Sequence, residues 1–205
     1  MGYTHYFYSK PELPSWPEFR QDAQKILDTA RAMGLKLAGP QGTGAPILSD
    51  DVLSLNGAEH CGHAPNTDIS IPWPAPTATG IGDNATAIAG GWFAGSLLQH
   101  RACNGDCSYE TFHLSRTWPQ NDSRGPHWIG TDDKQYRFAC CKTAYRPYDV
   151  VVTALLIAAK RHFGDAIRVN TDGEEKDWND GRILYTVATG DDGQRFAGPT
   201  LFSKD

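Results

Sequence analysis

The chain has 205 residues, of which 40% are hydrophobic and 11% aromatic, which is enough for one domain with a sizeable core. With 19 basic and 24 acidic residues its formal net charge is −5, which argues against a nucleic-acid-binding surface. No stretch approaches the roughly 18 consecutive apolar residues of a membrane span, and residues 1–6 lack the features of a secretory signal. We therefore expect a cytoplasmic protein without membrane contact.

The first third of the chain predicts a strand, a helix and further short strands. Aromatic and polar residues alternate over 2–8, which indicates a strand. Ser15 and Glu18 have the spacing of a capping box, and apolar residues then recur every three or four positions, which predicts an amphipathic helix over 16–33. A short strand at 35–38 follows, and 47–55 is either a strand or one helical turn.

Composition changes after the Asn56-Gly57 pair, which is typical of a turn. Residues 58–107 are poor in apolar periodicity, and 72–96 are rich in Pro, Gly, Ala and Thr. We interpret 58–107 as a loop-rich insertion within a single domain of 1–205. Unstructured loops of this length are uncommon in compact domains, so the insertion needs a source of order.

Strands are predicted again at 109–116 and 134–141. Pro147 suits the first turn of a helix that runs to Phe163 and is apolar on nearly every side, which is typical of a buried central helix. A strand at 166–170 and an ambiguous final helix at 178–188 precede a polar tail that we expect to be mobile. The irregular crossovers favour an α+β fold, in which a single mixed or antiparallel sheet packs with two or three helices.

Reactive and charged side chains are concentrated where the predicted strand ends and the buried helix begins. Cys141 is a candidate nucleophile, because the helix N-terminus and nearby cations would lower the pKa of its thiol. His5 or His113 could act as the base, and Asp149 or Glu110 could orient that base. The alternative is that Cys141 is a small buried apolar residue, as free cysteines often are.

The same junction could bind an anion. Lys142, Thr143 and Arg146 precede the helix and could hold a phosphate or carboxylate, with Tyr148 and Asn56 as further substrate contacts. Structural roles are about as plausible, since Thr143 could cap the helix and Arg146 could pair with an aspartate.

Two close pairs of metal-binding residues lie in the insertion. The preferred ligand set is His60, His63, Cys103 and Cys107, with Cys61 as the alternate. Tetrahedral zinc takes four such ligands, usually as two pairs on tight loops, so we expect a zinc site that is structural rather than catalytic. A local disulfide between Cys103 and Cys107, or unligated residues, are the alternatives. A cytoplasmic location and an odd number of cysteines argue against a disulfide framework.

Short motifs occur along the chain in a fixed order: Gly2-Tyr3-Thr4-His5-Tyr6, Asn56-Gly57, Glu110-Thr111-Phe112, Cys141-Lys142-Thr143-Ala144, Arg146-Pro147-Tyr148-Asp149, His162-Phe163-Gly164-Asp165 and Asp172-Gly173. Together they resemble a family of uncharacterised phage and bacterial proteins. The resemblance covers most of the chain except about 58–106. It implies no activity, because none is established for that family, but it aligns Cys141 with the family's cysteine.

Two functions therefore stand as hypotheses. The first is a small enzyme, a hydrolase or group transferase, that uses Cys141 on a small polar or phosphate-bearing molecule. The second is a non-catalytic ligand- or partner-binding protein with a zinc-stabilised insertion. A small-molecule ligand suits both hypotheses, and a nucleic-acid partner suits neither.

Overall fold

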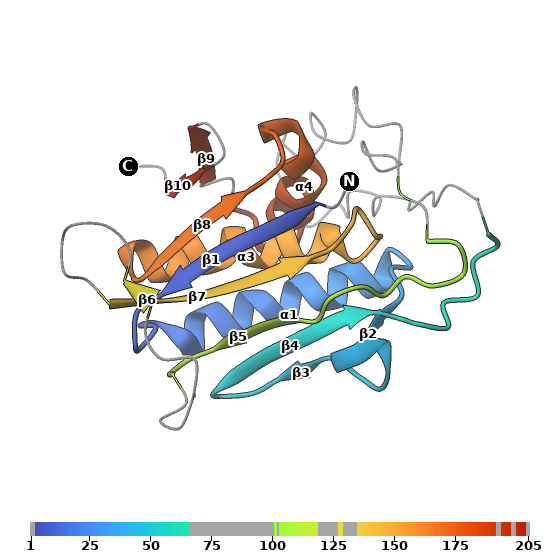
Figure 1. Cartoon of the computed structure of the whole chain (residues 1–205), viewed down its shortest axis with the longest axis horizontal. Helices are drawn as coiled ribbons and strands as arrows, with labels where there is room; N and C mark the ends of the chain where they lie inside the picture. The colour runs from blue at the N-terminus through green and yellow to red at the C-terminus, as the bar shows by residue number, and fades with distance from the viewer. Residues whose placement is uncertain are drawn as a thin grey trace.

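The computed structural model describes residues 3–65, 101, 103–118, 127–128, 135–191, 194–197 and 200–203. Within these residues the fold is α+β, with antiparallel strands on one side and helices packed behind them (Figure 1). The predicted α+β class is confirmed, with two antiparallel sheets in place of the single sheet that was predicted. No helix in the described residues combines the length and apolar character needed to cross a membrane.

The larger sheet has six strands in the order β6-β7-β1-β8-β10-β9 among the described residues, and its neighbours pair antiparallel. At its centre β1 (Thr4–Ser9) lies between β7 (Gln135–Lys142) and β8 (Ile167–Thr171). The register places His5 directly opposite Cys141, so both side chains lie on the same face. The remaining strands are short: β6 (His127–Trp128), β9 (Gln194–Ala197) and β10 (Thr200–Ser203).

The smaller sheet is built around β4 (Val52–Gly57), with β5 (Phe112–Ser115) on one edge. The other edge pairs with β2 (Leu37–Ala38) and β3 (Ile47–Leu48) (Figure 1). A short 3₁₀ turn, Pro40–Gly42, connects β2 towards β3.

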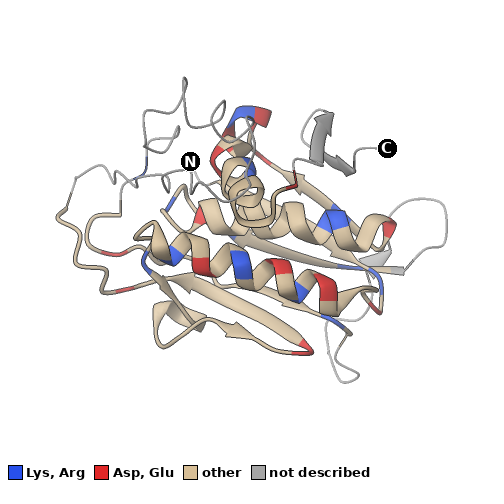
Figure 2. Ribbon diagram, turned by 180° about the vertical axis from the view of Figure 1, so that it is seen from behind, with Lys and Arg blue, Asp and Glu red and all other residues tan. Residues whose placement is uncertain are grey.

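The helices cover one face of both sheets, and Figure 2 shows α1 (Trp16–Ala32) and α3 (Asp149–Phe163) side by side on that face. In α1 the apolar residues face inwards, and the charged residues form pairs such as Lys25–Asp22 on the solvent side. In α3, 13 of the 15 residues are buried, which confirms the predicted central helix. After the 3₁₀ turns Gly164–Ala166 and Glu175–Trp178, α4 (Asn179–Thr189) packs against α1 and α3.

Three local predictions are wrong. Ser15 makes no side-chain cap, because its backbone is left-handed with φ of 53°. The stretch 47–55 is neither one strand nor a helical turn, since a turn at 49–51 divides it into a hairpin of β3 and β4. Asn56-Gly57 is the end of β4 rather than a turn. Beyond Gly190, where no element was predicted, the described residues include β9 and β10, which pair with each other and extend the sheet from β8.

Candidate metal centre and buried polar network

The two ends of the insertion meet beside β4. The backbone N–H of Cys107 donates to the carbonyl of Ala58 over 3.0 Å, so residues 58 and 107 lie together. Any side chain at Gly57 would collide with the carbonyl of Cys107, which explains the glycine there. Asn56 fixes the returning strand, because its side chain donates to the carbonyl of Tyr109 and accepts from the N–H of Tyr109, each over 3.0 Å. Asn56 is fully buried in this arrangement.

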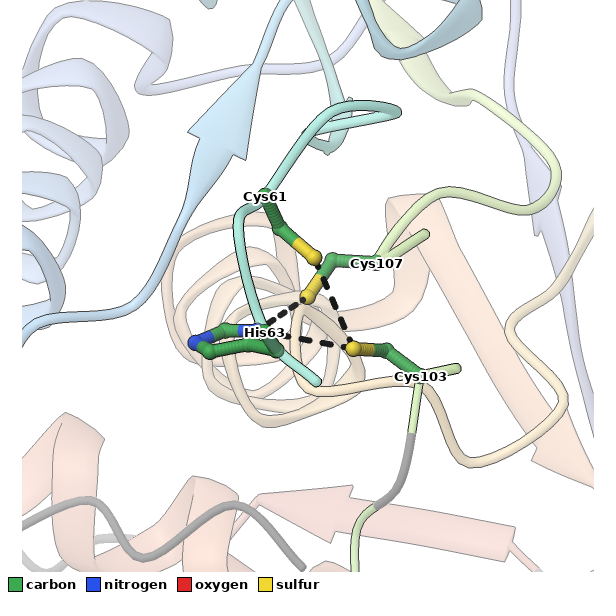
Figure 3. Close-up of side chains that lie close together, drawn as sticks. All are labelled: Cys61, His63, Cys103 and Cys107. Carbon is green, nitrogen blue, oxygen red and sulfur yellow. Dashed lines mark hydrogen bonds between the residues drawn. The ribbon is translucent and has the colours of Figure 1, made fainter. Parts of the chain in front are cut away.

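This closure brings four side chains together, Cys61, His63, Cys103 and Cys107, which we call the metal-ligand cluster (Figure 3). Their ligand atoms all lie within 4.8 Å of one another. The Sγ atoms of Cys61 and Cys103 are 3.5 Å apart, which is far longer than a disulfide bond of about 2.05 Å. Cys103 and Cys107, the pair of the predicted local disulfide alternative, are free thiols, as are the other cysteines of the described residues.

The cluster has the dimensions of a tetrahedral metal site. Nδ1 of His63 lies 3.4 Å from Sγ of Cys103 and 3.3 Å from Sγ of Cys107. Zinc bonds of about 2.3 Å to sulfur and 2.0–2.1 Å to nitrogen would give ligand–ligand edges of roughly 3.5–3.8 Å. The donor set of three sulfurs and one imidazole nitrogen is one that structural zinc sites use. The residues therefore fit a zinc ion with small adjustments.

Tight turns place these ligands. Gly62 and Gly105 adopt φ of +77° and +87°, which a residue with a Cβ adopts only at a cost, and each stands between two ligands on its own loop. His60 is exposed, and it is Cys61 that joins the other three ligand residues. The preferred set containing His60 is therefore corrected to the alternate set containing Cys61, because the turn at Gly62 brings residues 61 and 63 to the same side.

Burial and neighbouring groups shift the pKa values of two thiols of the cluster in opposite directions. Burial opposes ionisation of Cys61, but hydrogen bonds, first from the backbone of His63, outweigh it and lower its pKa. Burial, followed by the neighbouring thiols of Cys61 and Cys103, raises the pKa of Cys107. Thiols crowded in this way ionise together only when a cation offsets their charge, which is what a bound divalent metal does.

Arg101 lies two positions before Cys103 in the chain. Its side chain is buried in the core and pairs with Asp149, the first residue of α3. Its Nη1 donates to Oδ2 of Asp149 over 2.7 Å, and its Nη2 lies 3.5 Å from Oδ2 of Asp180. Oδ1 of Asp149 accepts from Thr143 over 2.6 Å and contacts Nε2 of His5 at 2.7 Å. We call these five residues, His5, Arg101, Thr143, Asp149 and Asp180, the Asp149 network, and each of them is essentially inaccessible to solvent.

Neighbouring groups of the Asp149 network stabilise the ionised form of Asp149. Burial opposes ionisation of Asp149, but the guanidinium of Arg101 and then His5 outweigh it and hold the pKa of this carboxyl at about 2. Edge-on aromatic contacts from Tyr3 and Trp178, with ring centroids at 4.7 and 5.1 Å, enclose His5. Tyr3 also stacks on Tyr145 at 4.1 Å, in a turn where Ala144 and Tyr145 have positive φ. That uncommon backbone turns Thr143 inwards.

The other predicted site residues are divided between the interior and the surface. Cys141 is fully buried, its Sγ donates to the carbonyl of Glu110 over 3.4 Å, and burial raises its pKa. Tyr148 is buried and donates to the same carbonyl over 2.7 Å. The Glu110 carboxylate accepts from the N–H of Lys142, whose ammonium lies 5.6 Å from the Tyr109 ring centroid.

His113 lies on the smaller sheet, whereas Arg146 is bound through its backbone to two members of the Asp149 network, since its N–H donates to the carbonyl of Thr143 and its carbonyl accepts from the N–H of Asp149, each over 2.9 Å. His113 is exposed on β5 and lies 2.9 Å from Oγ of Ser115. Arg146 is half-buried in the turn before α3. The structure thus joins His5 with Asp149 and Thr143, and it places His113 on the exposed side of β5. Arg101 and Asp180 were missed at the sequence level.

Comparisons with protein-family models, curated proteins and solved structures give no match, so the function has to be argued from this chain's own residues.

Proposed function

We propose that this chain is a non-catalytic ligand- or partner-binding protein whose insertion is held by one structural zinc ion. The observation that carries the proposal is the mutual proximity of the four ligand atoms of Cys61, His63, Cys103 and Cys107, all within 4.8 Å. Four protein ligands complete a tetrahedron and leave no position for a reacting water. This favours a structural metal over a catalytic one.

The energetic argument points the same way. The insertion has little apolar periodicity, and a structural zinc supplies folding free energy that such a segment lacks. The resemblance to phage and bacterial proteins outside the insertion stays a prediction, and so does the cytoplasmic location.

Metal analysis tests the proposal directly. Purified protein should contain one zinc per chain, and the cobalt-substituted protein should show thiolate-to-cobalt charge-transfer bands with the visible spectrum of a tetrahedral ion. Cys61→Ser should abolish stoichiometric binding, whereas His60→Ala, which alters the neighbouring exposed imidazole, should not. A protein with no metal and five freely titratable thiols would overturn the proposal.

One observation favours a second candidate, the enzyme with Cys141 as nucleophile. His5 faces Cys141 across the β1–β7 pair and contacts Asp149 through Nε2 at 2.7 Å, which is the order of groups in a thiol–imidazole–carboxylate arrangement. Burial of Cys141 and its raised pKa oppose this function. The substrate would be a small polar or phosphate-bearing molecule.

Alkylation kinetics separate the two candidates. In a Cys140→Ser background, an activated Cys141 should react with iodoacetamide at pH 7 faster than a free cysteine does, and His5→Gln should abolish the acceleration. Alkylation of Cys141 only under denaturing conditions would eliminate the enzyme and leave the zinc proposal intact.

A further inference from the structure

The two sheets meet along β5 and β7 without pairing. β5 pairs with β4, whereas β7 pairs with β1 and, at its start, with β6. The segment just before β5 meets the end of β7, where the N–H of Glu110 donates to the carbonyl of Lys142 over 3.2 Å. Beyond it the two strands diverge (Figure 1). A pocket of about 520 Å³ is lined by residues of both strands. This volume is typical of small-molecule sites, which span roughly 300–1,000 Å³.

The lining of this pocket combines apolar and polar groups. Phe7, Leu114 and Ala139 are apolar members of the lining, and Trp118 and Phe138 add aromatic side chains to it. Hydroxyl groups come from both sheets, since Ser9, Thr111 and Ser115 also line it. A few convergent polar groups among aromatic side chains are what fixes a small ligand's orientation in a binding pocket.

Arg137 gives the pocket a charged end. Its guanidinium is half-buried, and burial lowers its pKa, although an arginine remains charged at neutral pH. The Glu110 carboxylate accepts from the N–H of Lys142 over 2.7 Å and is not part of the pocket lining. Residues 137 and 142 are five positions apart on β7, roughly 16 Å along a strand.

We propose that this pocket binds a small aromatic anion, with its ring against Trp118 and Phe138 and its carboxylate or sulfonate on the guanidinium of Arg137. This inference rests on the ligand-binding function proposed above and names the class of ligand. A planar guanidinium binds such groups through paired, charge-assisted hydrogen bonds, and the imidazole of His113 lies in the same lining.

Cys140 provides a reporter inside the pocket. Its thiol is exposed and lines the pocket, whereas Cys61, Cys103, Cys107 and Cys141 are buried. A neutral alkylating reagent should therefore modify Cys140 first, and a ligand in the pocket should slow that modification.

The test uses the zinc-loaded full chain and 8-anilinonaphthalene-1-sulfonate, an aromatic sulfonate that fluoresces in apolar sites. We expect one saturable site, and alkylation of Cys140 by iodoacetamide slowed at least threefold at saturation. Arg137→Gln should weaken binding about 10-fold, and Arg137→Lys should weaken it less. The matched control is Arg20→Gln, which alters an exposed arginine on α1 and should change nothing.

A neutral analogue, N-phenyl-1-naphthylamine, isolates the contribution of the charge. Its affinity should be the same for the native chain and for Arg137→Gln, which also shows that the variant keeps its pocket. Equal sulfonate binding by both proteins, or unprotected Cys140, would overturn the inference. Zinc content measured on the same samples keeps the two proposals separate: bound zinc without pocket binding contradicts only this inference, and pocket binding without zinc contradicts only the metal site.

Discussion

The metal-ligand cluster and the Asp149 network are two residues apart in the chain, at Cys103 and Arg101, yet they hold the fold in different ways. The cluster joins two loops whose described apolar contacts are those of the cysteines with one another and with Ala58, and its four ligand atoms lie close enough to hold a metal ion. The network lies inside the main core, where a carboxylate is stabilised by an arginine and a histidine. Because Arg101 belongs to the insertion and Asp149 to α3, the order of one region should influence the other.

Of the changes considered, removal of the metal should have the largest effect on the structure, and it should act on the insertion first. Chelation at neutral pH is expected to open the insertion, because structural zinc contributes on the order of 10 kcal/mol of binding free energy in small domains. Limited proteolysis should then cut first within 58–107, while α1 and α3 stay protected. Cleavage that begins elsewhere in the chelated protein would show that the cluster does not hold the insertion.

Breaking the network from the insertion side should have the next largest effect. Arg101→Met leaves Asp149 buried without its main cation, which typically costs about 3–5 kcal/mol. Urea denaturation should measure this loss, and zinc content should stay at one per chain. The double variant with Asp149→Leu should recover part of the stability, since a buried pair replaced by apolar residues is often tolerated.

Acid should weaken the network by a smaller amount. The pKa of Asp149 falls from 3.8 to about 2 on folding, so its contribution is complete above about pH 4 and is lost as the pH falls towards 2. The loss should approach about 2 kcal/mol. Urea titrations between pH 5 and 2.5 should show it as the difference in acid slope between the native chain and Asp149→Asn, because protonation of the zinc ligands affects both proteins alike. Identical slopes would mean that the carboxylate is not stabilised in this way.

Removal of an exposed ion pair should reduce the stability least. Comparison with the buried pair then shows how much of the stabilisation depends on burial. Arg20 and Asp50 lie 2.6 Å apart, slightly closer than Arg101 and Asp149, but their side chains are 42% and 81% exposed. We expect Arg20→Ala to cost less than about 0.5 kcal/mol, because solvent screens such pairs. Thermal unfolding of Arg20→Ala beside Arg101→Met measures this contrast, and comparable losses would contradict it.

Sequence periodicity was sufficient to predict the helices α1 and α3, because their apolar patterns are long and regular. The metal ligands were predictable as two close pairs, but the choice between His60 and Cys61 depended on the turn at Gly62. Arg101 had no local signal, since it lies in a segment without periodicity and acts on a residue 48 positions away. Asp149 did carry a signal: a carboxylate at the start of a helix buried on all sides requires a cation. The pocket between β5 and β7 depends on two strands that do not pair, which the sequence does not encode locally.

The hydrogen bond between Cys107 and Ala58 has a consequence for the evolution of this fold. Because β4 and β5 are antiparallel neighbours, residues 58–107 occupy the place of a hairpin loop, and a short turn could replace them without moving either strand. Such a deletion would also withdraw Arg101 from the core. A shorter homologue should therefore carry either a different cation or an uncharged residue in place of Asp149, and this paired change would mark the gain or loss of the whole segment.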